Sequence, residues 1–251
     1  MMLETLRLGC MVREAPVGTP QLLGALRVEM APAALSRGHV AFAPAMDGND
    51  TLSDCTAAGL ANAIRAQAAI AGVQVGLATA DVVRFYSAST GYDPNNPASD
   101  SGGYETDVLS YQLEHGFAAS AQVPWVGLWG TIDPRDLNGV RLAMTHMGCA
   151  YLGVELALAD QGGGRWDTTT AGDQTPGSWG GHCLLAWAYD GIEPDSTVWL
   201  ATWGRLVPAT WRWVASRCME AHGVAHRQLL GPDGRNGVGV DWDRLAAECV
   251  G

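Results

Sequence analysis

Apolar residues recur at helical spacing through much of the first half of the chain. The stretch that follows Cys55 is rich in alanine, with aliphatic residues three and four positions apart. Val82, Val83 and Tyr86 share one face of a second segment, and a third, amphipathic segment ends at Gly116, which suits a helix C-cap. The pattern predicts helices over residues 56–71, 80–90, 105–115 and 134–146.

The second half of the chain changes to the short apolar runs that are typical of strands. Three strands are predicted, at residues 149–156, 182–190 and 197–203, and a long loop over residues 160–180 precedes the second of them. Two further helices are predicted near residues 211–221 and 242–249. Helices followed by strands within 251 residues predict an α+β fold, either as one large domain or as two lobes.

Charge and hydropathy restrict the partners of this chain. Lysine and arginine number 15 against 26 aspartates and glutamates, so the formal net charge is −11. We expect neither nucleic acid nor a membrane surface as the main partner, because binding to phosphate groups needs local positive charge. The alanine-rich residues 57–80 are long enough to span a membrane, but Asn62, Arg65, Gln67 and Gln74 argue against it.

The cysteines and the first residues indicate where the protein is made and kept. Six cysteines, at positions 10, 55, 149, 183, 218 and 249, form no CxxC pair, which favours reduced thiols. Residues 1–10 contain Glu4 and Arg7 and lack the apolar core of a signal peptide. A cytoplasmic protein without a signal peptide is therefore expected.

Cys55 and His182 are the strongest candidates for chemistry. Ser53 and Asp54 suit an N-cap, so Cys55 falls in the first turn of a helix, where free N–H groups and the helix dipole favour a thiolate. His182 begins a predicted strand after Gly180 and Gly181, and glycines leave room for a substrate chain. The alternative for both residues is structural: a small buried thiol and a buried, hydrogen-bonded histidine.

These residues resemble the motifs of papain-like cysteine peptidases. That family places a cysteine at the start of a helix in a helical lobe and a histidine at the start of a strand in a β-rich lobe. The resemblance covers roughly residues 45–215 and includes Gly102-Gly103 and the segment from Ala201 to Gly204. It implies a single papain-like domain over residues 1–251, with a helical lobe at about 45–135, an antiparallel β-rich lobe at about 140–215, a cleft between them and a C-terminal extension at 216–251.

The resemblance also implies roles for individual residues. Cys55 would attack a peptide bond of a peptide or protein substrate, His182 would be base and then acid, and Asn49 would hold the oxyanion. Substrate-binding positions follow at the glycine motif, beside the histidine and at the tryptophan of the last segment: Gly102, Gly103, Gly181 and Trp203. No cofactor is implied.

Several positions depart from the family pattern. The asparagine that should orient the histidine is replaced by Ala201, and the neighbouring Thr202 points to the opposite face of its strand. Asn49 is shorter than the usual glutamine, and a carboxylate at Asp54 would oppose a thiolate at Cys55. Only 54 residues precede Cys55, and no inhibitory propeptide is predicted among them. An alternative function follows, a catalytically inactive structural or binding protein, as a component of a phage or prophage particle with other virion proteins as partners.

A metal site is the remaining possibility. Cys218, His222 and His226 are spaced four residues apart and would share one face if they lay on a helix. However, Gly223 weakens such a helix, and no His-Glu-x-x-His motif is present. We therefore expect no metal.

Overall fold

The computed structural model describes residues 6–13, 15–22, 29–117 and 127–250. Its helices are α1 (Cys55–Ala71), α2 (Thr79–Thr90), α3 (Glu105–His115), α4 (Leu137–Met147), α5 (Trp211–Arg217) and α6 (Trp242–Glu248), with short 3-10 turns at Pro97–Ser99, Leu158–Gly162 and Arg227–Leu229. Its strands are β1 (Cys10–Met11), β2 (Gln21–Leu22), β3 (Gly103–Tyr104), β4 (Gly127–Ile132), β5 (Ala150–Leu156), β6 (Gly180–Tyr189), β7 (Thr197–Thr202), β8 (Arg205–Thr210), β9 (Cys218–His226) and β10 (Cys249–Val250).

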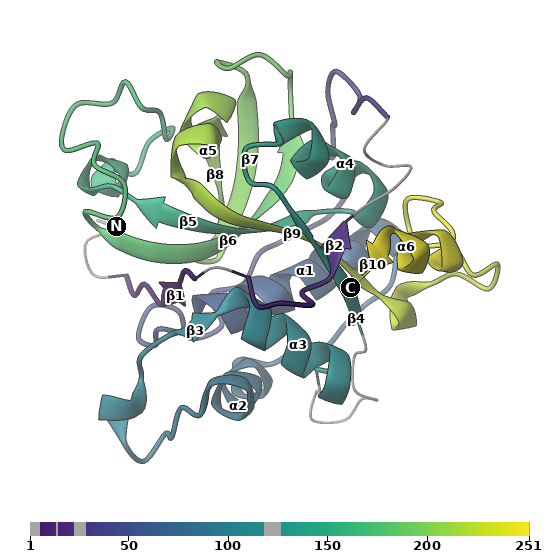
Figure 1. Ribbon diagram of the computed structural model, residues 1–251, viewed down its shortest axis with the longest axis horizontal. Helices are drawn as coiled ribbons and strands as arrows, with labels where there is room; N and C mark the ends of the chain where they lie inside the picture. The colour runs from purple at the N-terminus through teal and green to yellow at the C-terminus, as the bar shows by residue number, and fades with distance from the viewer. Residues whose placement is uncertain (1–5, 14, 23–28, 118–126, 251) are drawn as a thin grey trace.

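Within the described residues, one eight-stranded sheet carries the β-rich lobe. Its strand order is β10-β2-β4-β9-β5-β6-β7-β8, and every pair is antiparallel except β2 with β4. The helices α2 and α3 lie together beyond one side of the sheet, in the lower part of Figure 1. Strands β1 and β3 pair in parallel as a separate two-stranded sheet near the start of α3, where the helical lobe meets the β-rich lobe. The α+β arrangement expected from the sequence, helices followed by an antiparallel β-rich part, is confirmed.

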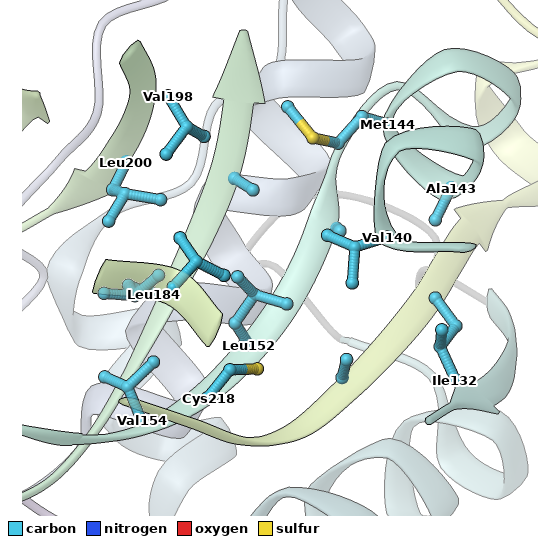
Figure 2. Packing of buried hydrophobic residues seen from close by; sticks show 14 of the residues in the cluster. Ile132, Val140, Ala143, Met144, Leu152, Val154, Leu184, Val198, Leu200 and Cys218 are labelled. Carbon is cyan, nitrogen blue, oxygen red and sulfur yellow. The ribbon is translucent and has the colours of Figure 1, made fainter. Parts of the chain in front are cut away.

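Both faces of the central strands are buried, each against a different helix. Tyr151 and Leu185 belong to the core around α1, whereas Leu152 and Leu184 belong to the core around α4 and α5. Figure 2 shows this second core, where side chains of β5, β6 and β7 meet Val140 and Met144 of α4. Because neighbouring positions on a strand point to opposite faces, burial on both faces explains the nearly continuous apolar runs of β5 and β6.

The periodicity predicted α1 and α3 closely but failed at the end of α5. The prediction of a helix as far as Ala221 is wrong, because α5 ends at Arg217 and β9 begins at Cys218. β9 lies between β4 and β5 and pairs with both, so the interior of the sheet dictates its conformation. The segment expected from the sequence to be an extension, residues 216–251, thus supplies a central strand of the sheet before it forms α6 and β10.

Among the described residues, no helix has the length and apolar character needed to cross a membrane.

Candidate active site

Cys55 occupies the first position of α1 and is buried, with 1% of its surface exposed. Burial raises the pKa of its thiol to about 12, and backbone groups of Cys183 and Gly9 offset part of this effect. The expectation that the helix start favours a thiolate is therefore wrong for this state. Desolvation outweighs the helix dipole, whose effect at a helix end is modest, and Cys55 is a neutral thiol at neutral pH.

Asp54 precedes Cys55. Its carboxyl repels a thiolate less than an ionised aspartate would. Although it is the N-cap residue of α1, its side chain makes no capping hydrogen bond. Burial raises the pKa of the Asp54 carboxyl to about 8, with further contributions from Asp47 and Asp100. The carboxyl is therefore mostly protonated at pH 7, and only a minor fraction carries the charge that would repel a thiolate.

His182 lies near the start of β6 and is completely buried. Its Nε2 is 2.6 Å from the hydroxyl oxygen of Thr202, and its ring stacks on Trp203 with centroids 4.0 Å apart and planes 16° apart. Burial lowers the pKa of the imidazole to about 3, so the ring is neutral. When Nε2–H donates to Thr202, the lone pair of Nδ1 is left as the acceptor, and Nδ1 has no hydrogen-bond partner among the described residues.

Thr202 is the partner of His182, next to Ala201, the position that the family pattern indicates for the orienting residue. β6 and β7 are in register with Leu185 opposite Ala201, so Ala201 shares the face of Leu185, towards α1. His182 lies three positions before Leu185 and therefore on the other face, which it shares with Thr202. Thr202 does point away from the face of Ala201, as expected, but His182 lies on that same face, so the expectation that Thr202 is a poor partner for the ring is wrong.

Replacing Thr202 by valine should remove this hydrogen bond while keeping the shape of the side chain. The buried Nε2 of His182 would lose its partner, which costs about 1–3 kcal/mol. Urea unfolding should show a loss of this size for Thr202→Val and little change for Thr197→Val, a matched substitution at the partly exposed start of the same strand. Equal losses in the two variants would contradict the role of the hydrogen bond.

The fold brings the beginnings of α1 and β6 together. The Cys55 thiol lies against the backbone of Cys183, the residue that follows His182 in β6. No hydrogen bond joins the Cys55 sulfur to His182 in the described part of the chain, since Nδ1 is unpartnered and Nε2 is bound to Thr202. The two candidate residues are therefore brought near each other by their elements, but their side chains lie on opposite faces of β6 and form no ion pair.

An N-terminal segment, residues 7–13, lies between the two lobes and covers this position. The Gly9 N–H donates to the carbonyl of Gly181 at 3.2 Å, and the Gly103 N–H donates to the carbonyl of Gly9 at 2.8 Å. Cys10 and Met11 continue as β1, in parallel register with β3. The segment is thus bound through its backbone to both glycine motifs at once.

Close packing explains why glycine occupies these positions. A Cβ on Gly102 would lie 2.0 Å from the Gly9 carbonyl oxygen, and a Cβ on Gly181 would lie 2.1 Å from that of Cys10. Trp203 donates from its indole N–H to the carbonyl of Arg7 at 3.4 Å. All four residues predicted to bind substrate, Gly102, Gly103, Gly181 and Trp203, therefore contact the N-terminal segment.

Arg13 anchors the end of the segment to α3, and Asn49, the proposed oxyanion donor, lies in the loop before α1. The Arg13 side chain donates to the Thr106 hydroxyl at 3.0 Å, pairs with Asp107 and lies over the Tyr104 ring. Asn49 is buried, and its Nδ2 donates to the Leu52 carbonyl at 3.1 Å, so one of its two amide hydrogens is used within the loop before α1.

The position of the N-terminal segment was not predicted from the sequence. The available signal was short: apolar Leu6, Leu8 and Cys10 alternate with Arg7 and Gly9, which is the period of a strand. Five residues of alternation are too few to distinguish a strand from a loop, and the strand itself is only two residues long.

No protein-family model matches the sequence, and no curated protein matches it. Several solved structures match the fold of the chain. Xylellain, a cysteine protease from Xylella fastidiosa, is 14% identical with a TM-score of 0.62, and the match covers 88% of this chain and 96% of that one. Procathepsin B from Trypanosoma congolense is 9% identical with a TM-score of 0.60, covering 90% and 88%. Procathepsin L 3 from Tenebrio molitor larval midgut is 14% identical with a TM-score of 0.55, covering 88% and 74%. The chain therefore has the fold of papain-like cysteine proteases.

Proposed function

We propose that this chain, which has the papain-like fold, is a cysteine hydrolase that cleaves peptide bonds and is held closed by its own N-terminal segment. One observation carries the proposal. The segment is an extended peptide that binds through its backbone to Gly103 on one side and Gly181 on the other, beside Cys55. A substrate chain could use the same donors and acceptors after the segment leaves, as extended peptides do when they add a strand.

In the proposed reaction, the His182 side chain first turns from the face of β6 that it shares with Thr202 towards Cys55 as the segment leaves. The Cys55 thiol then passes its proton to a ring nitrogen of His182, and the sulfur attacks the carbonyl carbon of the substrate. The oxyanion is held by the backbone N–H of Cys55 and by Asn49, once its amide turns from Leu52. His182 then gives the proton to the leaving amine, and a thioester is left on Cys55. Water, deprotonated by His182, hydrolyses the thioester and restores the thiol. In the closed state Thr202 and Trp203 hold the ring on the face of β6 that lies away from α1.

The closed state should be inactive for an electrostatic reason. The pKa values of Cys55, about 12, and His182, about 3, lie far apart because both groups are buried. At 1.36 kcal/mol per unit, moving the proton from sulfur to nitrogen in this state costs on the order of 10 kcal/mol. Departure of the N-terminal segment would admit water and substrate and reduce that cost. Two of the structural neighbours are pro-forms of cathepsins, which supports an interpretation of the closed state as a precursor.

A second function has one observation in its favour. The buried Cys55 and His182 are neutral and not hydrogen-bonded to each other, as expected of an inactive papain-like module that only binds a peptide strand. In that case the position would hold the N-terminal segment or a segment of another chain. Membership in a phage particle, virion partners and a cytoplasmic location remain predictions from the sequence.

Hydrolysis of an unfolded protein separates the two functions. After the N-terminal segment is displaced, the enzyme should release peptides from an unfolded protein substrate, and Cys55→Ala should abolish the release because no other group replaces the nucleophile. Cys149→Ala, at another fully buried thiol of the same core, should retain hydrolysis. Absence of hydrolysis in the displaced protein, with its fold intact by circular dichroism, would favour the binding module.

A further inference from the structure

Glu105, Glu220 and His222 form a buried cluster beside the N-terminal segment. Glu105 is the first residue of α3, whereas Glu220 and His222 lie two positions apart on β9 and so on the same face of the sheet. The His222 Nε2 is 3.4 Å from a Glu105 carboxylate oxygen and 3.5 Å from one of Glu220. One donor atom from each residue falls within 4.8 Å of the other two, and Glu105 and His222 are at most 1% exposed.

The polar atoms that face one another in this cluster are not satisfied by hydrogen bonds. Within the described residues, Oε2 of Glu105 and Nε2 of His222 are buried and have no hydrogen-bond partner. The other ring nitrogen of His222 lies 3.3 Å from the Thr131 hydroxyl, which can accept its N–H. That tautomer turns the Nε2 lone pair towards two carboxylates, an arrangement that a metal ion or a proton between them would satisfy.

The spacing of the donors suits a small metal ion. Ligands that lie 2.0–2.1 Å from a tetrahedral zinc ion are about 3.3–3.4 Å from one another, close to the separations of the His222 nitrogen from the two carboxylates. One imidazole and two carboxylates are ligands that zinc accepts, whereas calcium and magnesium prefer oxygen alone. A histidine ligand that donates its second N–H to an oxygen, as His222 can to Thr131, is common at zinc sites.

We propose that Glu105, Glu220 and His222 bind one divalent transition-metal ion, with zinc the best fit, through a three-ligand site that leaves a fourth position for water. The site departs from the expectation that no metal binds. It is also distinct from the set Cys218, His222 and His226: neighbouring members of that set lie four residues apart on β9, which separates them by about 13 Å. The site does not depend on the proposed function.

The same carboxylates also contact the N-terminal segment. The Cys10 sulfur is 3.8 Å from the second oxygen of Glu105, and the Arg13 N–H donates to the second oxygen of Glu220 at 3.4 Å. Gly153 of β5 leaves the space for Glu105, because a Cβ there would lie 3.2 Å from the carboxylate carbon. A bound ion would fix the orientation of both carboxylates and should raise the melting temperature of the closed protein.

The test is a zinc titration of the full-length protein after treatment with a chelator, followed by calorimetry. We expect one zinc ion per chain, a dissociation constant below about 1 µM and a higher melting temperature, because a ligand that binds only the native state stabilises it. Glu105→Gln and His222→Gln should each weaken zinc binding by at least about 100-fold. Glu248→Gln and His226→Gln, at a buried carboxyl and a buried imidazole that each also contain one unpartnered atom, should leave the affinity unchanged.

Two outcomes would overturn the proposal. In the first, the wild-type protein binds no zinc at stoichiometric concentration, which would indicate that a proton on His222 alone bridges the carboxylates. In the second, binding survives His222→Gln but is lost in Cys249→Ser, which would place the ion at the partly exposed thiol. The wild-type titration decides the first outcome even if a site variant fails to fold.

Discussion

The variant Gly9→Val is expected to increase the rate at which iodoacetamide alkylates Cys55 by about 100-fold to 1,000-fold at neutral pH. A Cβ on residue 9 would lie 1.9 Å from the Ser53 carbonyl oxygen, a backbone atom that cannot move aside without disturbing the start of α1. The N-terminal segment must therefore leave its place. Departure exposes the sulfur and removes much of the desolvation that raises the Cys55 pKa to about 12, so more of the reactive thiolate forms.

A glycine in open space provides the control for this variant. A Cβ on Gly164 would meet no atom within 4 Å, so Gly164→Val should leave the alkylation rate of Cys55 as it is in the wild type. The measurement is the time course of alkylation at each cysteine, read by mass spectrometry of peptides. An unchanged rate at Cys55 in Gly9→Val would show that the segment does not control access to this thiol.

In the Gly9→Val background, the second substitution His182→Ala is expected to reduce peptide hydrolysis by about 10²–10⁴-fold, the usual contribution of a general base. Its effect on pH dependence is more specific. With His182 present, the imidazolium stabilises the thiolate, and alkylation of Cys55 should persist down to about pH 6. Without it, alkylation should appear only as the pH rises towards about 8.5, the ordinary thiol pKa.

The matched control is His226→Ala in the same background. His226 is also buried, and burial also lowers its pKa to about 3, but it lies on β9 and its ring is bound to Gln67. Hydrolysis and the pH profile should remain those of the Gly9→Val protein. If His182→Ala and His226→Ala gave the same profile, loss of a buried histidine would explain the effect, and a role as base would be excluded.

The opposite pKa shifts of Cys55 and His182 also predict the pH range in which the closed wild-type protein is stable. A histidine whose pKa falls to about 3 on folding costs stability as the pH drops below about 6.5, because only the unfolded chain takes up the proton there. A thiol whose pKa rises to about 12 costs stability above about pH 8.5, where only the unfolded chain loses its proton. These two groups therefore lower the stability of the closed protein below about pH 6.5 and above about pH 8.5, and not between these values.

Local periodicity was sufficient to predict α1, α3 and the runs that form β5 to β7, because burial on one face or both leaves a repeating pattern in the sequence. It could not predict β9, whose residues Cys218 to His226 include a glycine and three charged or polar side chains at strand positions. That strand exists because β4 and β5 supply its hydrogen bonds on both sides, and no local pattern records such pairing.

In the candidate site, too, local sequence predicted some features, whereas others depend on tertiary structure. Cys55 and His182 were found because glycines, caps and a family resemblance surround them in the sequence. That His182 shares the face of Thr202 was not predicted, because it depends on the register of β6 with β7. Burial of Cys55, which reverses the expected direction of its pKa shift, depends on residues 7–13 packing between the lobes. The cluster of Glu105 with His222 joins residues more than a hundred positions apart and has no sequence motif.

The central claim is that Cys55, assisted by His182, is the nucleophile at the position now covered by residues 7–13. The most direct measurement is capture by a peptide that bears an electrophilic epoxide, with the modified residue identified by mass spectrometry. The account predicts a single adduct on Cys55 that forms faster in Gly9→Val than in the wild type and is lost when His182→Ala is added. Adducts spread over the other five thiols, or none on Cys55 in the folded Gly9→Val protein, would contradict it.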